Sequence, residues 1–178
     1  MPSQSASGDP TSSGGGTAGQ VAAMAFPPGE WELLTHLPAR VIVAATSAEP
    51  DGPRRTVAEG LAGLDAIAAG RAFDSDLVRA VVSAIYAEAD DDRPAAEEFI
   101  DRAAGLAEVL DACRRATDVL AARADPADSA AYRQWLQSVA ARVCGAARSG
   151  GVLGLGGEHV SAAERRFLDD LAIALALA

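Results

Sequence analysis

Apolar residues recur every three or four positions along most of this chain, and this spacing constrains the fold more than any other feature. The pattern begins near Glu30 and continues to the C-terminus. It places apolar side chains on one face of successive α-helices. These residues are mainly Ala, Leu and Val, with few of the aromatic residues that strands prefer. We therefore predict an all-α fold for residues 30–178, a compact bundle of about six helices.

Residues 1–29 have a different composition, dominated by Ser, Gly, Thr, Ala and Pro, with Asp9 as the only charged side chain. Such a segment buries too little apolar surface to offset the entropy lost on ordering, so we predict a disordered tail. Within it, residues 21–26 form an apolar patch that begins with Val21 and ends with Phe26. This patch either leads into the first helix or docks on the domain or on a partner.

The first helical segment contains Pro38, which suits the first turn of a helix and disrupts a helix interior. We expect two short helices or one kinked helix here. Residues 41–43 are apolar and β-branched, so a buried strand is the alternative, although the surrounding alanines favour helix.

The next helix is expected to start at a capping box formed by Thr56 and Glu59 and to run to about Gly70. Four apolar residues are spaced four, three and four positions apart in it, and we expect them to form its buried stripe. They are Val57, Leu61, Leu64 and Ala68.

Later helices show similar signals. Ser75 or Asp74 is expected to cap a helix that buries Val78, Val81, Val82 and Ile85. From Pro94 a heptad-like seam is expected to pack inside the domain, with an intermolecular coiled coil as the alternative. The seam consists of Phe99, Ala103, Leu106, Leu110, Cys113, Thr117 and Leu120.

The last two helices have clear start signals. Asp125 and Pro126 begin one of them, and a capping box of Ser161 and Glu164 begins the other. The predicted core residues of the two helices are Tyr132, Trp135, Leu136, Val139, Val143, Phe167, Leu168, Leu171 and Leu175.

The charge of the chain excludes several functions. It has 25 acidic and 15 basic residues, with no Lys, and a net charge of −10. Such a surface repels phosphate backbones and anionic lipids, so we predict no nucleic-acid partner and no electrostatic membrane attachment. No apolar stretch approaches the roughly 18 residues of a membrane span, and no signal peptide is recognisable. We predict a cytoplasmic protein with no membrane insertion.

The glycine-rich segment 150–157 resembles a phosphate-binding loop only superficially. It lacks the lysine and the preceding strand that nucleotide-binding motifs require. We interpret it as a loop that packs Val152, Leu153 and Leu155 into the core.

Neither histidine has a partner at metal-ligand spacing. A site made of Glu158, His159 and Glu164 is conceivable, but a solvated polar cluster is the preferred interpretation, and His36 stands apart.

The acidic residues at 90–92, with Glu97 and Glu98, suit a solvated helix start. Cys113 and Cys144 are interpreted as buried free thiols, with a disulfide left open. The sequence therefore predicts no catalytic, cofactor-binding or metal-binding residues, and an enzyme is disfavoured.

Two stretches of the chain resemble each other. Asp51-Gly52, followed by Thr56 and Glu59, parallels the segment 156–164, in which Ser161 and Glu164 follow a glycine turn. This arrangement is similar to the tellurite-resistance TerB-like helical family. The segment S-G-G-V-L-G-L-G at 149–156, followed by Val160 and Ser161, resembles uncharacterised bacterial proteins with an S-G-G-F-L-G-F-G loop before a helix start.

The resemblance implies an all-helical fold, a link to stress response and metal held by acidic residues in the two turns. Asp51 and Glu59 would be the candidates in the first turn. The second turn has Gly157 where the family has Asp, and a hard cation requires several oxygen ligands. Our preferred hypothesis is therefore a non-enzymatic binding or assembly module whose partner is a protein, including a second copy. A metal-responsive stress protein and an enzyme with an unrecognised site are the alternatives.

Overall fold

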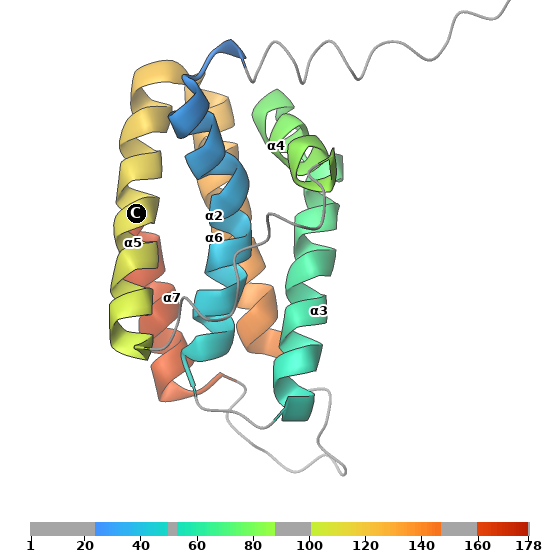
Figure 1. The fold of residues 1–178 in the computed structure, drawn as a ribbon, viewed down its shortest axis with the longest axis vertical. Coiled ribbons are helices and arrows are strands. Elements are labelled where there is room, and N and C mark those ends of the chain that lie inside the picture. The colour runs from blue at the N-terminus through green and yellow to red at the C-terminus, as the bar shows by residue number, and fades with distance from the viewer. Residues whose placement is uncertain (1–23, 50–52, 88–100, 147–159, 178) are drawn as a thin grey trace, which may run out of the picture.

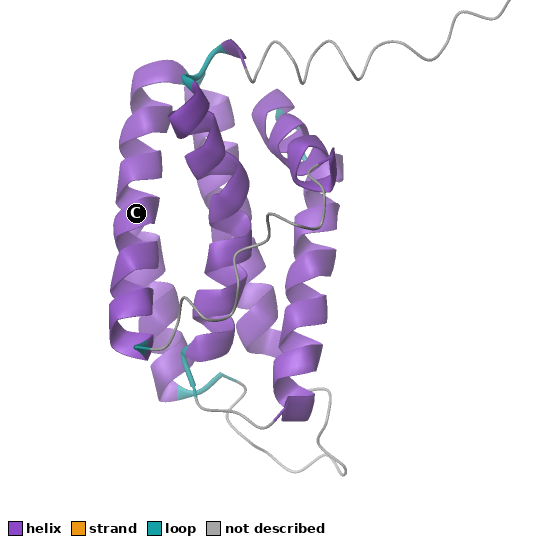
Figure 2. Ribbon diagram, viewed as in Figure 1, coloured by secondary structure: helices purple, strands orange, loops and turns teal. Residues whose placement is uncertain are grey.

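Six α-helices and one short 3₁₀-helix build the part of the chain that the computed structural model describes, residues 24–49, 53–87, 101–146 and 160–177 (Figure 1). No strand occurs in these ranges, so the all-α prediction is confirmed (Figure 2). The elements are α2 (Pro28–Ser47), α3 (Pro53–Ala69), η1 (Gly70–Ala72), α4 (Asp76–Ala87), α5 (Arg102–Arg123), α6 (Pro126–Ala146) and α7 (Ala162–Ala174).

Helix α6 is the centre of the bundle, since it packs against each of the other five α-helices. In Figure 1, α2 crosses in front of it, α5 and α7 lie on one side, and α3 and α4 lie on the other. The core face predicted for this helix is confirmed. Its five residues, Tyr132, Trp135, Leu136, Val139 and Val143, are fully buried.

Helix α2 is one continuous helix of 20 residues, although Pro38 lies inside it. Proline has no backbone N–H, so the carbonyl of Leu34, four residues earlier, loses its partner within the helix. The Tyr132 hydroxyl on α6 donates a hydrogen bond to this oxygen at 2.7 Å. A tertiary contact thus supplies the bond that the sequence removes. Residues 41–43 are helical, which excludes the strand alternative.

Helix α3 and the first residue of η1, which follows it directly, approach α2 and α6 closely because glycines face them. A Cβ atom on Gly63 would lie 2.7 Å from the Ile42 side chain, and one on Gly70 would lie 2.8 Å from the Trp135 indole nitrogen. That indole N–H donates to the carbonyl of Ala66 at 3.3 Å. This carbonyl belongs to the last turn of α3, where helix carbonyls lack partners of their own.

The start of α3 differs from the prediction. The helix begins at Pro53, so Thr56 lies inside it, exposed, and the capping box predicted for Thr56 and Glu59 is wrong. Proline is favourable at the first helical position, where an N–H would lack a partner, and this moves the start toward the N-terminus. Glu59 is instead buried in the helix, with 1% of its surface exposed.

The other predicted caps are confirmed. The Ser75 hydroxyl oxygen accepts a hydrogen bond from the Val78 N–H at 3.2 Å and donates to Asp128 on α6 at 2.6 Å. At the start of α7, the Glu164 carboxylate accepts from the Ser161 N–H at 2.6 Å, and the Glu164 N–H donates to the Ser161 hydroxyl at 3.1 Å. These bonds satisfy backbone groups that a helix start leaves open.

The apolar patch before α2 docks on its own domain through Phe26. This side chain is buried, and its ring centroid lies 6.1 Å from that of Trp31. Met24 is exposed, and Val21 lies outside the described residues.

The buried face of α5 differs from the predicted seam. Ala103 is exposed, and Leu106, Leu110 and Thr117 are only partly buried, whereas Phe99 lies outside the described residues. Smaller residues occupy much of the interior face, because α5 packs closely against α2 and α7. The buried residues are Gly105, Val109, Ala112, Cys113, Ala116 and Leu120.

Replacing Tyr132 with Phe keeps the buried ring but leaves the Leu34 carbonyl without a donor. We expect Tyr132→Phe to lower the free energy of unfolding by about 1–3 kcal/mol, the cost of an unsatisfied buried polar group. Urea unfolding followed by circular dichroism measures this change. The exposed Tyr86 provides the matched control, because Tyr86→Phe retains its ring contact with Arg71 and removes no buried bond. Equal stabilities of the two variants would contradict this role of Tyr132.

Candidate functional site

Three large apolar side chains of α3 point to solvent. Val57 is 63% exposed, Leu61 is 59% exposed and Leu64 is 51% exposed. They lie four and three residues apart, so they share one face of the helix, and the partly exposed Ala68 extends this face by another turn. We call these four residues the α3 stripe.

The α3 stripe is the set of residues that the sequence predicts as the buried face, and this prediction is wrong. The buried face contains Glu59, Gly63, Ala66 and Ile67 of α3 and continues to Gly70 of η1. Four of these, at 59, 63, 66 and 70, repeat the same spacing of four, three and four, shifted by two residues. A shift of two residues is about 200° around a helix, so the two faces are nearly opposite.

The close approach of α3 to its neighbours explains which face is buried. The inner face meets Ile42 and the Trp135 indole at positions where no Cβ fits, so it requires glycine. Leucine side chains are too large for that contact and point outward. The sequence signal that could have identified the inner face was therefore the small residues Gly63, Ala66 and Gly70 rather than its hydrophobicity.

The surface around the α3 stripe is unusually poor in charge. Over residues 56–69, the charged residues are Glu59, which is buried, and Asp65, which is exposed. Helix α5 differs, because its outer face carries several ion pairs, such as Arg115 with Asp111 at 2.5 Å. An exposed apolar face with little charge on a packed domain is typical of a contact surface.

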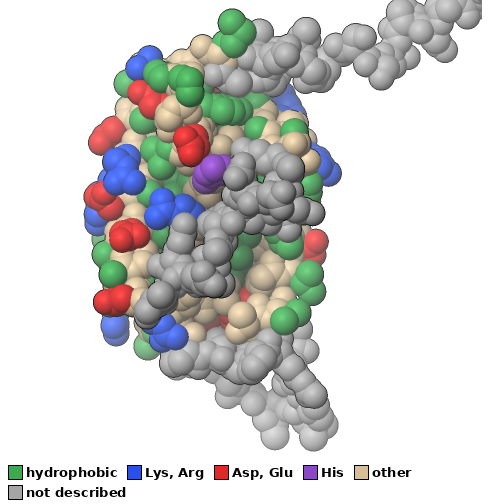
Figure 3. Space-filling view, viewed as in Figure 1, with side chains coloured by type: hydrophobic (Ala, Val, Ile, Leu, Met, Phe, Trp, Pro, Cys, Tyr) green, Lys and Arg blue, Asp and Glu red, His purple; other side chains and the backbone are tan. Residues whose placement is uncertain are grey.

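The position of α3 leaves this face open. The helix lies at one edge of the bundle, with α2 and α6 packed on its inner side (Figure 1). Figure 3 shows hydrophobic side chains along this edge of the molecule. The described part of the chain has three other exposed large apolar residues, Met24, Tyr86 and Ile173, which belong to other segments.

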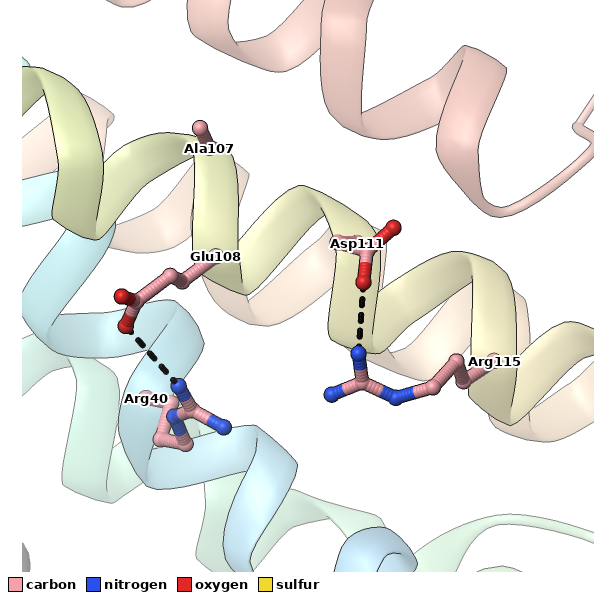
Figure 4. A pocket seen from close by; sticks show the side chains of 5 residues that line it. All are labelled: Arg40, Ala107, Glu108, Asp111 and Arg115. Atoms are coloured by element: carbon pink, nitrogen blue, oxygen red, sulfur yellow. Dashed lines mark hydrogen bonds and ion pairs between the residues drawn. The ribbon is translucent and has the colours of Figure 1, made fainter.

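A hollow of about 390 Å³ lies between α2 and α5 and is lined by Arg40, Ala107, Glu108, Asp111 and Arg115 (Figure 4). Its charges pair with one another. Arg40 lies 3.9 Å from Glu108, and Arg115 lies 2.5 Å from Asp111. The two guanidinium groups are thus matched by two carboxylates, which leaves the lining without a net charge to attract a charged ligand. It is a weaker candidate than the α3 stripe.

Among the predicted metal-site residues, only Glu59 and Glu164 lie in the part of the chain that the structure describes. No group of three or more His, Cys, Asp and Glu side chains in the described ranges is placed to hold a metal ion. Glu59 is buried in α3, whereas its predicted companion Asp51 lies outside the described residues. His36 lies on α2, and Glu164 serves the capping box of α7.

Several other sequence predictions fall outside the described residues. They concern Glu158 and His159, the glycine-rich loop 150–157 with Val152, Leu153 and Leu155, and the acidic residues of segment 90–98.

Cys113 on α5 and Cys144 on α6 are fully buried thiols, as predicted, and they form no disulfide. Burial raises the pKa of the Cys113 thiol to about 12, against the opposing effect of Arg40 and Arg114. A thiol that stays protonated at neutral pH is a poor nucleophile. Burial also raises the pKa of the nearby Tyr132 well above 10, so both groups are neutral parts of the core.

No helix within the described ranges is both long and apolar enough to cross a membrane. Compared with models of protein families, with curated proteins and with solved structures, the chain matches none. The TerB-like resemblance therefore stays a prediction, and the α3 stripe is the feature from which function is argued.

If the α3 stripe is a surface feature, truncating it has little effect on folding. We expect Leu61→Ala to change the free energy of unfolding by less than about 1 kcal/mol in dilute protein, as for an ordinary surface substitution. Leu37→Ala on α2 is the matched control, because Leu37 is fully buried, and it is expected to cost about 2–5 kcal/mol. Urea unfolding compares the two variants. A loss of about 2–5 kcal/mol in the free energy of unfolding for Leu61→Ala, as large as that of a core truncation, would show that the stripe is interior.

The raised pKa of Cys113 predicts a loss of stability in alkali. The unfolded thiol ionises near pH 9.0, while the folded thiol stays protonated to about pH 12. The unfolded state therefore binds fewer protons in this window, and stability falls as pH rises, by up to about 1.4 kcal/mol per pH unit for one group. The free energy of unfolding, measured from pH 8 to pH 11, should fall less steeply with pH for Cys113→Ala than for the wild type. The same dependence on pH in both proteins would contradict the raised pKa of Cys113.

Proposed function

We propose that this chain is a non-enzymatic helical module of the bacterial cytoplasm that binds a protein partner along the α3 stripe. The observation that carries the proposal is the exposure of Val57, Leu61 and Leu64 on one face of an edge helix. Exposed side chains at this spacing match the way in which one helix recognises another, through anchors at i, i+4 and i+7.

The chemistry of the surface supports a protein partner over other ligands. The chain carries a net charge of −10, which disfavours nucleic acids and anionic lipids. The face itself has one exposed carboxylate, Asp65, beside apolar side chains. Such a face has little to offer a charged small molecule, and the apolar face of an amphipathic helix complements it well.

The structural setting also suits binding. Gly60, beside the stripe, has open space where a Cβ would stand, so a partner backbone can approach closely there. The inner side of α3 is fixed against α2 and α6, which holds the stripe rigid before binding. A rigid surface loses little conformational entropy when a partner docks, and this favours affinity.

Site-specific crosslinking in the expressing cells tests the proposal without assuming who the partner is. A photoreactive benzophenone amino acid at Gly60 should form covalent adducts with a protein bound to the stripe. The same amino acid at Asp118, on the exposed face of α5, is the matched control. We expect adducts from position 60, none from position 118, and loss of the adducts when Leu61→Glu is added, because a charge on the stripe opposes apolar contact.

Peptide mapping of the adducts identifies the protein that is bound. Absence of adducts at position 60, or adducts that persist with Leu61→Glu, would contradict binding through the α3 stripe. Circular dichroism of the Leu61→Glu variant checks that the helical fold is intact, which the exposure of Leu61 leads us to expect.

A further inference from the structure

The spacing within the α3 stripe is symmetric, and this property bears on the identity of the partner. Val57, Leu61, Leu64 and Ala68 are separated by four, three and four residues, so the order of gaps is the same in both directions. A two-fold axis between Leu61 and Leu64 therefore maps the stripe onto an antiparallel copy of itself. Such an interface uses the same patch on both subunits.

We propose that the α3 stripe binds a second copy of this chain, with the two α3 helices antiparallel across that axis. This inference rests on the proposed function and names its partner. In this arrangement Leu61 of each copy packs against Leu64 of the other, and Val57 packs against Ala68. Each large residue at the outer end thus faces a small one, which allows the helices to pack evenly along their length.

Within residues 56–69, the placement of charge fits this pairing. The same axis sets Asp65 of one copy opposite Gly60 of the other, where a Cβ would find open space. The two Asp65 carboxylates are then offset by five positions, about 7.5 Å along the helices, instead of facing each other. Two chains with a net charge of −10 repel each other, so a face with so few charges is the favourable place for them to meet.

The area of the α3 stripe limits the expected affinity of the dimer. Helix α3 has 17 residues and is about 25 Å long, so a single helix pair buries less than the roughly 800 Å² per partner of a standard stable interface. We expect a reversible dimer with a dissociation constant on the order of 10 to 100 µM. Salt should strengthen it, because screening reduces the repulsion between the two acidic chains.

Sedimentation equilibrium of the purified full chain, from about 10 µM to about 1 mM, measures this association. The wild type should change from monomer to dimer across that range, and Leu61→Glu and Leu64→Arg should each stay monomeric. Ile173→Glu is the matched control, since Ile173 on α7 is 73% exposed and lies outside the stripe, and this variant should dimerise like the wild type.

Mixing the two stripe variants tests the antiparallel register. In a mixed dimer, the glutamate introduced at position 61 of one chain would face the arginine introduced at position 64 of the other, while unchanged leucines would meet at the second contact. We therefore expect the mixture of Leu61→Glu and Leu64→Arg chains to form a heterodimer, although neither chain associates by itself. A parallel pair could not be rescued in this way, because each position would then face its own counterpart.

Three results would overturn the inference: a wild type that stays monomeric up to about 1 mM, a dimer unaffected by Leu61→Glu, or a mixture that fails to associate. The crosslinking experiment separates these failures from failure of the proposed function. Adducts at position 60 with a different protein, together with a monomeric wild type, would retain the α3 stripe as a docking face and exclude the second copy. Absence of both adducts and dimer would exclude both.

Discussion

The backbone carbonyl of Leu34 depends on another helix for its hydrogen bond, and that bond joins α2 to the central helix α6. Pro38 removes the donor from α2, and Tyr132 on α6 replaces it from inside the core. The side chains of α6 make similar bonds to other neighbours. Trp135 donates to the end of α3, Gln137 donates to a carbonyl of α7, and Asp128 accepts from the cap of α4. Helix α6 thus fixes its neighbours by directional bonds as well as by apolar contact.

These bonds determine how near α3 must come to α6. The Trp135 indole reaches a carbonyl of α3 only if glycine lies against its ring, and Gly70 fulfils this requirement. With Gly63, Ala66 and Gly70 at the close contacts, three of the larger apolar residues of this helix lie outside in the α3 stripe, whereas Ile67 is buried. The candidate binding face is therefore a consequence of the same close packing that orders the core. The buried face and the α3 stripe lie on nearly opposite sides of this helix.

Two other features of the described residues carry no net charge. The hollow between α2 and α5 contains charges that neutralise each other, and the thiol of Cys113 stays protonated because burial raises its pKa. The buried thiol of Cys113 is part of the packed core. Among the residues that the structure describes, the exposed apolar residues of α3 form a row that no contact within the domain covers.

The sequence by itself determined the helical class, the core face of α6, the cap of α4 and the capping box of α7, because each follows from local spacing or from a local hydrogen bond. It did not determine that Pro38 lies within one helix, since the compensating donor, Tyr132, is 98 residues away from the carbonyl it serves. Nor could periodicity decide which face of α3 or α5 is buried. In α3 two stripes have the same spacing, and hydrophobicity favoured the leucines over the glycines. Only the tertiary structure made that choice, because the distance between packed helices, rather than the affinity of one side chain for the core, decides which residues fit.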